Sequence, residues 1–310
     1  MSSPNRTDRH ELIVVTGAST GIGAATAREL ARRGFHVLAG VRREADADAL
    51  RAERIEPHIL DITVESDIAA IADRVAGDPL RRPLRALINN AGIAVNAPVE
   101  ALPINEWRKQ FEVNLFGQVA MIQALMPALL ISSGTVVNIS SVGGKVALPT
   151  YGAYAGSKFA LEAVSDALRR EVSGVGIKVV VVEPGAVKTE MAERGIATAE
   201  GLQEDMTAAQ LARYGDLAAA VTAQARSFNE TGVSAEHAAK VIAKAATTSR
   251  PRTRYTIGRD AAILVRIGRV VSDRVLDRVV RVNLRQFVPD QFEAATAGRL
   301  PREPLPVPKN

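Results

Sequence analysis

Short apolar runs recur along this chain of 310 residues, and longer stretches between them repeat apolar residues every three or four positions. The short runs predict buried strands at Leu12–Val15, Phe35–Val41, Pro57–Leu60, Leu84–Ile88, Thr135–Ile139, Ile177–Val182 and Arg254–Ile257. The longer stretches predict helices at Ile22–Arg33, Glu44–Arg54, Glu65–Ala76, Ile104–Leu130 and Tyr151–Val172. Apolar strands joined by helices are typical of parallel sheets. The pattern therefore predicts an α/β fold with a doubly wound parallel sheet, in one domain over residues 1–260.

A glycine-rich segment, Thr16–Gly23, directly follows the first predicted strand, with glycines at positions 17, 21 and 23. Ligands of doubly wound sheets bind at the carboxyl ends of the strands. A glycine-rich turn that leads into a helix offers backbone N–H groups and the helix dipole to an anion, and it lets a pyrophosphate come close. The segment predicts a nucleotide site, with an ordinary tight turn as the alternative.

The composition of the chain excludes several kinds of chemistry. The chain has no cysteine, so disulfides and thiolate catalysis are excluded, and its four histidines are isolated in sequence, so no metal site is expected. The 39 basic and 34 acidic residues are interspersed and give a net charge of +5, which requires no nucleic-acid partner. The polar start, Met1–Glu11, and the absence of a run of membrane-spanning length predict a cytoplasmic protein without signal peptide or transmembrane segment.

Tyr154 and Lys158 lie four residues apart, hence on one face of a predicted helix. A nearby ammonium group favours the phenolate and lowers the pKa of the tyrosine toward working pH, as a general acid or base for an alcohol and ketone pair requires. Ser141 lies at the end of a predicted strand, thirteen residues before Tyr154. The alternative is a pair of solvated helix residues with no catalytic role.

Several motifs occur together in one order: Thr16–Gly23, Asp61, Asn89–Gly92, Asn114, Asn138–Ser141, Tyr154 with Lys158, and Pro184–Thr189. Together they resemble the compact, single-domain branch of the short-chain dehydrogenase/reductase family, over about residues 10–190. The resemblance implies a Rossmann fold. It also implies an enzyme that interconverts a carbonyl and an alcohol by hydride transfer.

The resemblance assigns catalytic roles to four residues. Tyr154 would pass the proton while a hydride moves to or from the nicotinamide, and Lys158 would hold the nicotinamide ribose and depress the pKa of Tyr154. Ser141 would hydrogen-bond the substrate oxygen, and Asn114 would position a water that links Lys158 to solvent, through a backbone kink in its helix. Ser140 is also at the strand end, but Ser141 matches the family's distance to Tyr154. Tyr151 also precedes the lysine, but only Tyr154 has a lysine four positions on.

The same resemblance implies which residues bind the dinucleotide, and no metal is implied. They are Gly17, Ser19, Thr20, Gly21, Ile22, Gly23, Arg42, Arg43, Asp61, Ile62, Asn89, Ala91, Gly92, Tyr154, Lys158, Pro184, Gly185, Val187 and Thr189. Asp61 and Ile62 would flank the adenine. Val187 would meet the carboxamide, and Thr189 the phosphates.

The end of the second predicted strand indicates which dinucleotide is used. Val41 takes the place where an acidic residue would bind the ribose 2′-hydroxyl of NAD, and Arg42 and Arg43 follow it. Guanidinium groups bind a 2′-phosphate, so NADP(H) is favoured over NAD(H). Two points weigh against this interpretation. Thr20 stands where many NADP-dependent relatives carry a second basic residue, and an exposed arginine pair is also common on solvated helices.

The segment from 190 to about 232 predicts a helical substrate lid, with Met191, Leu202, Met206, Leu211, Tyr214 and Leu217 among many alanines. Such residues suit a mobile cover over an apolar ligand, or they simply pack the lid on the body. The sequence is similar to the branch with retinol and 17β-hydroxysteroid dehydrogenases. A bulky, hydrophobic, steroid- or retinoid-like alcohol or ketone is therefore expected as substrate.

Residues 261–288 predict a basic C-terminal helix, with Arg274, Arg278, Arg281 and Arg285 in one stripe beside valines. Such a helix could dock on anionic lipid as a peripheral membrane contact, guard the substrate mouth, or form a solvated edge packed on the body or a partner. The proline-rich stretch 289–310 is expected to be disordered.

Two other functions and the assembly state remain open at this stage. An epimerase or dehydratase on the same domain would have a different glycine spacing and a larger C-terminal domain. A non-catalytic dinucleotide sensor or scaffold would not need the four catalytic residues. By family resemblance, the helices 104–130 and 151–172 would pair copies of the chain, so a homo-oligomer, dimer or tetramer, is expected.

Overall fold

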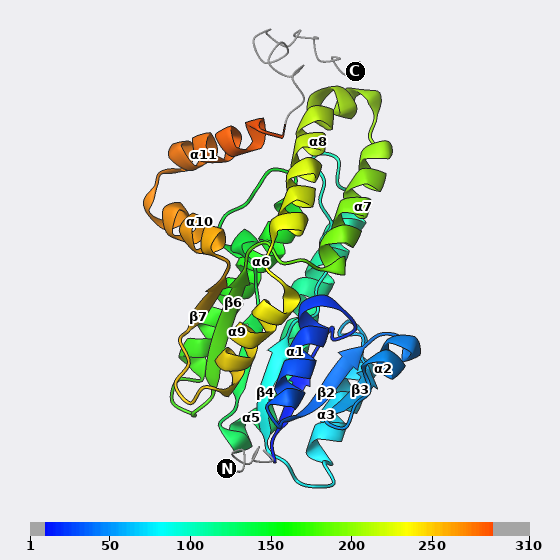
Figure 1. Ribbon diagram of the computed structural model, residues 1–310, viewed down its shortest axis with the longest axis vertical. Helices are drawn as coiled ribbons and strands as arrows, with labels where there is room; N and C mark the ends of the chain where they lie inside the picture. The colour runs from blue at the N-terminus through cyan, green and yellow to red at the C-terminus, as the bar shows by residue number, and fades with distance from the viewer. Residues whose placement is uncertain (1–9, 288–310) are drawn as a thin grey trace, which may run out of the picture.

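Seven strands form one parallel sheet within residues 10–287, the part of the chain that the computed structural model describes (Figure 1). The strands are β1 (Leu12–Val15), β2 (His36–Val41), β3 (Ile55–Ile59), β4 (Leu84–Asn89), β5 (Thr135–Ile139), β6 (Lys178–Pro184) and β7 (Arg254–Ile257). Their order is β3-β2-β1-β4-β5-β6-β7, with every neighbouring pair parallel. The predicted doubly wound sheet is confirmed, and the loops after β1 and β4 diverge where the strand order reverses.

Helices cover both faces of this sheet. They are α1 (Gly21–Arg32), α2 (Glu44–Leu50), α3 (Glu65–Ala76), α4 (Ile104–Phe111), α5 (Gly117–Ser132), α6 (Gly152–Glu171), α7 (Glu190–Glu204), α8 (Ala208–Thr231), α9 (Ala235–Thr247), α10 (Arg259–Val270) and α11 (Asp273–Arg285). α1 and α9 pack side by side on one face, and α3 and α5 pack on the other (Figure 1).

The short strand β1 shows why these runs are apolar throughout. Ile13 and Val15 point into the core on the α1 and α9 side, whereas Leu12 and Val14 point into the core on the α3 and α5 side. All four side chains are fully buried. Because successive side chains of a strand alternate between faces, a strand that is covered on both faces needs apolar residues at every position.

Two predicted helices have different boundaries in the structure. α2 ends at Leu50 and not at Arg54, because Ala52 and Ile55 form an antiparallel bridge that turns the chain into β3. The stretch predicted as one helix over 104–130 consists of α4, a single π-helical turn η1 (Glu112–Phe116) and α5. The π-helical turn holds Asn114 and interrupts the α-helical hydrogen bonding at the place where the resemblance implied a backbone kink.

This continuous helical stretch, Ile104–Ser132, is long and apolar enough to cross a membrane by length and composition alone. The expectation that no run reaches that length was wrong, because α4, η1 and α5 join into one stretch. In the structure, Met121, Leu125 and Leu129 of α5 are buried against the sheet. This part of the stretch therefore serves as a core helix of the fold.

The lid and the C-terminal extension rise beyond the carboxyl ends of the strands. The predicted lid interval corresponds to α7 and α8, which pack together as a helical pair above the sheet (Figure 1). The segment predicted as one basic helix over 261–288 forms two helices, because Val271 and Ser272 have an extended backbone between α10 and α11. α11 lies beside α8 (Figure 1). The tail predicted over 289–310 lies outside the described residues.

Candidate active site

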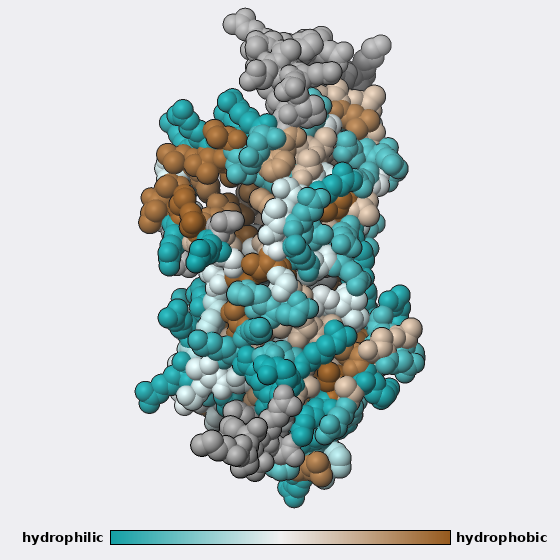
Figure 2. Space-filling view, viewed as in Figure 1, coloured by the Kyte–Doolittle hydropathy of each residue, from teal (hydrophilic) through white to brown (hydrophobic). Residues whose placement is uncertain are grey.

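One cavity of about 950 Å³ lies at the carboxyl ends of the strands. The loops after β1, β2, β3, β4, β5 and β6 contribute to one part of its wall, and α7, α8, α10 and α11 contribute to the other. Figure 2 shows this second part from outside as a hollow between α8 and the apolar residues of α10 and α11. The cavity therefore joins the nucleotide-type loop to a large space that could hold a second molecule.

The glycine-rich loop lies so close to its neighbours that side chains are excluded. Gly17 has φ +62°, and a Cβ there would lie 2.7 Å from the Cα of Ala91. A Cβ on Gly23 would lie 2.2 Å from the carbonyl oxygen of Gly17. The side chain of Thr20, which precedes α1, makes no capping hydrogen bond. The first N–H groups of α1 are thus left to an outside anion, which fits the pyrophosphate of a dinucleotide.

Asn90 rather than Asn89 supports this loop. The Nδ2 of Asn90 donates hydrogen bonds to the carbonyl oxygens of Thr16 (3.0 Å) and Gly17 (2.9 Å), and Asn90 lines the cavity. Asn89 is fully buried and faces away from the cavity. Its Nδ2 donates to the carbonyl oxygen of Gln118 and to Oδ1 of Asn138. The expected contact of Asn89 with the cofactor is therefore replaced by a structural role between β4 and its neighbours.

Arg42 and Arg43 diverge in the structure. Arg42 lines the cavity as expected, but Arg43 does not. Arg43 is the residue before α2 and binds Asp46 through two hydrogen bonds, of 2.8 Å and 2.7 Å. An arginine held by a carboxylate one helical turn away is less available to a phosphate than a free one. Apart from Arg43 and Asn89, the residues predicted to bind the dinucleotide all line the cavity.

Ser141 and Tyr154 come together at Gly143. The short turn Val142–Gly144 follows Ser141, whose Oγ accepts a hydrogen bond from the N–H of Gly143. A Cβ on Gly143 would lie 3.1 Å from Cε1 of Tyr154 and 3.4 Å from Oγ of Ser141. The tyrosine on α6 and the serine after β5 thus face one point of the cavity, where a substrate oxygen could meet both hydroxyl groups.

The pKa of Tyr154 differs from the expectation. Burial raises it above its ordinary value, and a hydrogen bond with Ser141 only partly opposes this. The expected lowering by Lys158 does not prevail, because Nζ of Lys158 lies 6.0 Å from the centre of the tyrosine ring and donates instead to the carbonyl oxygen of Ile139 at 2.8 Å. At neutral pH the side chain is a neutral phenol, which can donate a proton.

Lys158 and Asn114 lie behind this tyrosine. Burial lowers the pKa of Lys158 to about 8, and the charge of Glu162 on the next turn of α6 opposes the shift. A Cβ on Gly92 would lie 3.3 Å from Oδ1 of Asn114 and 3.7 Å from Nζ of Lys158, so the two polar groups meet at that glycine. Asn114 itself is fully buried and does not line the cavity. The four residues predicted to be catalytic therefore lie in one region of the structure, around Gly92 and Gly143.

The lid contributes only some of its predicted apolar residues. Met191 and Met206 line the cavity, together with Ala218 and Val221 of α8. The other four predicted lid residues, Leu202, Leu211, Tyr214 and Leu217, do not line it. Tyr214, for example, donates a hydrogen bond to Glu100 outside the cavity. Some of the predicted lid residues therefore face the cavity, and others pack or lie exposed.

α11 closes the cavity on the side away from the sheet. Leu284 is buried, and Val279, Val280, Asn283 and Phe287 line the cavity. The four arginines of the predicted stripe lie together along a separate outer surface of the helix. This position agrees with two of the roles considered for the helix: a guard of the substrate mouth, and a solvated cationic edge on a helix that packs against the body.

One polar contact between α8 and α11 could not be found from the sequence. Nε2 of Gln224 donates to Oδ1 of Asn283 at 2.6 Å, and both amides line the cavity among largely apolar residues. Gln224 is buried. The two residues are 59 positions apart, and no periodicity connects them.

Comparison with known proteins agrees with this geometry. Residues 11–200 match the family model described as short chain dehydrogenase. Human "Dehydrogenase/reductase SDR family member 9" is 34% identical over 269 residues, covering 83% of this chain and 82% of the relative. Mouse "Retinol dehydrogenase 7" is 36% identical over 265 residues, covering 81% of each. The crystal structure of a short chain dehydrogenase from Burkholderia cenocepacia in complex with NADP has a TM-score of 0.66 and 26% identity, covering 89% of this chain and 98% of that one.

These matches show that the chain is an oxidoreductase with a Rossmann-like fold. The chain belongs to the short-chain dehydrogenase/reductase family.

Proposed function

We propose that the chain is an NADP(H)-dependent oxidoreductase that interconverts the carbonyl and alcohol forms of a bulky apolar molecule. The observation that carries the proposal is the convergence of Ser141 and Tyr154 on one point of a large, mostly apolar cavity, next to the glycine-rich loop.

The residues of the chain fit a bound dinucleotide. When bound, the nicotinamide supplies or accepts a hydride. Ser141 donates a hydrogen bond to the substrate oxygen and stabilises the charge that develops on it. Tyr154, as a neutral phenol, donates its proton to that oxygen when a carbonyl is reduced. Lys158 and Asn114 hold the polar side of the site in place behind the tyrosine.

The cavity wall supports a bulky apolar substrate. Met191, Val221 and Val279 come from three different helices, and Met206 comes from the link between α7 and α8. Gln224 with Asn283 provides a polar spot among them. A ligand with an apolar body and a second polar group remote from the reacting carbonyl matches this wall. Steroid- and retinoid-like molecules have this form, and the similarity to a protein named retinol dehydrogenase points the same way.

The cofactor preference rests on the end of β2. Val41 gives no carboxylate for a ribose 2′-hydroxyl, while Arg42 lines the cavity and offers a guanidinium to a 2′-phosphate. A related structure is named as a complex with NADP. We therefore favour NADP(H) over NAD(H).

A titration tests the proposal directly. The purified protein is titrated with NADPH and with NADH, following nicotinamide fluorescence, and hydrophobic ketones are then added. We expect tighter binding of NADPH and its oxidation by at least one bulky ketone, with turnover lost in Tyr154→Phe and NADPH affinity kept. Tighter NADH binding would contradict the cofactor assignment. Dinucleotide binding without turnover on any ketone would favour the alternative, a non-catalytic sensor or scaffold.

We also propose that the chain forms a homo-oligomer through α5 and α6. Exposed large apolar side chains occur on both helices or beside them: Phe116, Leu130 and Ile131 in one and Phe159 in the other. Surface of this kind is commonly covered by a partner. Light scattering at micromolar concentration should give a dimer or tetramer mass, and a monomer mass alone would contradict the proposal.

A further inference from the structure

The lid helix α7 carries one arginine to the glycine-rich loop. Nη2 of Arg194 lies 3.5 Å from Oγ1 of Thr20, although the two residues are 174 positions apart. Thr20 directly precedes α1. Arg194 lines the same cavity as Thr20 and Arg42, so its side chain borders the space where the dinucleotide would lie.

The packing of α7 fixes this position. Gly195, the next residue, is buried, and a Cβ on it would lie 3.4 Å from Cβ of Ala94. The start of α7 is also fixed, because Oγ1 of Thr189 accepts a hydrogen bond from the N–H of Ala192. Arg194 thus projects from a helix that is seated on the body of the molecule.

Positive charge is concentrated around this point. Asp46 on α2 is the nearby carboxylate, and its pKa is held below its ordinary value, first by the hydrogen bond from Arg43 and also by the charges of Arg42 and Arg194. The charges of three guanidinium groups therefore act on Asp46, and Glu190 of α7 is a second carboxylate beside Arg43 and Arg194.

Arg43 and Arg194 differ in how strongly each is held by a carboxylate. Arg43 grips Asp46 with two short bonds, of 2.8 Å and 2.7 Å. Arg194 has an ion pair with Glu190 on its own helix, but the distance is 3.9 Å and its side chain is 59% exposed. A long contact between exposed groups is weak, so Arg194 can exchange it for a better anion at little cost.

We propose that Arg194 binds the 2′-phosphate of NADP(H) together with Arg42, and so provides from the lid the cation that the glycine-rich loop lacks at Thr20. This assignment rests on the proposed use of NADP(H). A phosphate dianion between two guanidinium groups forms charge-assisted hydrogen bonds with both. Because Arg194 belongs to α7, a bound 2′-phosphate also holds the lid against the nucleotide loop.

Two small nucleotides that differ in the 2′-phosphate separate the contribution of this phosphate to binding from that of the rest of the nucleotide. Calorimetric titration of the full chain with 2′,5′-ADP and with 5′-AMP gives the contribution of that phosphate as the ratio of the two affinities. We expect Arg194→Gln to weaken 2′,5′-ADP binding about tenfold and to leave 5′-AMP binding unchanged, since one charge-assisted contact has that order of magnitude. Arg226→Gln is the matched control, because Arg226 is a similarly exposed lid arginine that pairs with Glu200 and does not line the cavity.

Hydrogen exchange gives a second readout. Amide exchange over residues 190–204 should slow when 2′,5′-ADP binds, more than with 5′-AMP, and this extra protection should vanish in Arg194→Gln. An unchanged 2′,5′-ADP affinity in Arg194→Gln, or an equal loss for both nucleotides or in Arg226→Gln, would overturn the role of Arg194. If the unaltered protein bound 2′,5′-ADP no better than 5′-AMP, the NADP(H) assignment itself would fall, and Arg194 with it.

Discussion

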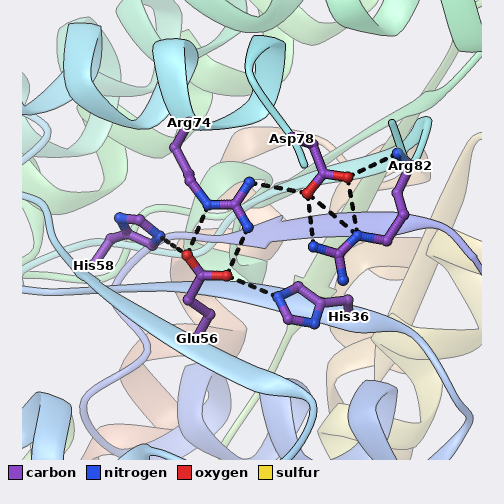
Figure 3. A network of polar contacts seen from close by, with 6 residues as sticks. All are labelled: His36, Glu56, His58, Arg74, Asp78 and Arg82. Carbon is purple, nitrogen blue, oxygen red and sulfur yellow. Dashed lines mark hydrogen bonds and ion pairs between the residues drawn. The ribbon is translucent and has the colours of Figure 1, made fainter. Parts of the chain in front are cut away.

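Arg74 of α3 donates two hydrogen bonds of 2.7 Å to the two carboxylate oxygens of Glu56 on the edge strand β3 (Figure 3). His36 and His58 approach the same carboxylate at 2.9 Å, so four side chains join β2, β3 and α3. The arrangement fixes the sheet edge that carries Arg42 at the end of β2. It also makes the stability of this edge sensitive to acid.

Breaking this contact should destabilise the fold in a pH-dependent way. The hydrogen bonds, first from Arg74, lower the pKa of Glu56 from 4.5 to about 2. A carboxyl group whose pKa is lower in the folded protein stabilises the fold at pH values above its pKa in the unfolded chain. For Glu56 this contribution is lost as the pH falls from about 4.5 to about 2. Arg74→Gln should lower the free energy of unfolding at pH 7 by about 2 kcal/mol.

Urea denaturation at pH 7, 5 and 3 measures this effect. The difference between Arg74→Gln and the unaltered protein should shrink toward pH 3, and the exposed Arg108→Gln on α4 should show none. A pH-independent difference would mean that Arg74 acts through packing or through Asp78, which lies 2.9 Å from its Nη1, and not through Glu56.

A methyl group in the glycine-rich loop should abolish dinucleotide binding. A Cβ on Gly23 would lie 2.2 Å from the carbonyl oxygen of Gly17, which is backbone and cannot give way. Gly23→Ala should therefore lose NADPH binding in a fluorescence titration. Gly215→Ala on α8 is the control, because nothing lies within 4 Å of a Cβ there. It should keep NADPH affinity and gain up to about 1 kcal/mol of helix stability. Unchanged binding in Gly23→Ala would contradict the assignment of the loop.

Glu162 should tune the pH dependence of catalysis. The carboxylate lies 2.7 Å from Nζ of Lys145 and 3.0 Å from Nη2 of Arg254, and its charge raises the pKa of the buried Lys158. Removal of that charge in Glu162→Gln should move the pKa of Lys158 further below about 8.

The alkaline limb of the kcat/KM profile for ketone reduction should move to lower pH in Glu162→Gln. In Glu162→Asp, which keeps a carboxylate, the limb should move less than in Glu162→Gln. Glu171→Gln changes an exposed residue at the end of α6 and should cause no shift. An unshifted limb in Glu162→Gln would show that Lys158 does not govern it.

The side-chain amides of Gln224 and Asn283 should select substrates by the chemistry of the end that is remote from the reacting carbonyl. Gln224→Leu removes the donor to Asn283 and one polar group of the cavity wall. We expect kcat/KM to fall about tenfold for ketones with a distal hydroxyl or carbonyl, and to stay or rise for ketones with an apolar far end. Ser227→Ala, on the same cavity wall, serves as the control. Equal losses for both classes of ketone would place the far end of the substrate elsewhere.

The parts of the site that the sequence predicts are those defined by local spacing. Thr16–Gly23 forms a turn whose geometry depends on its own glycines, and Tyr154 with Lys158 shares a face because of the period of one helix. The direction in which Asn89 points could also be predicted. Leu87 of β4 packs on the α5 side, so strand alternation turns Asn89 to that side as well, away from the cavity.

Other features depend on contacts that no sequence pattern contains. Arg194 meets Thr20 and Gln224 meets Asn283 only because α7 and α11 fold back over the carboxyl end of the sheet. The direction of the Tyr154 pKa depends on burial, which outweighs the effect of a lysine whose Nζ lies 6.0 Å from the ring.

The position of α11 has an evolutionary consequence. This helix walls the substrate side of the cavity, yet it follows the last strand of the sheet and packs on α8. Substitutions, insertions or exchanges in the final segment can therefore reshape the substrate wall without altering any strand or the nucleotide loop. Descendants of such a chain can acquire new substrates while inheriting the catalytic group and the cofactor half intact.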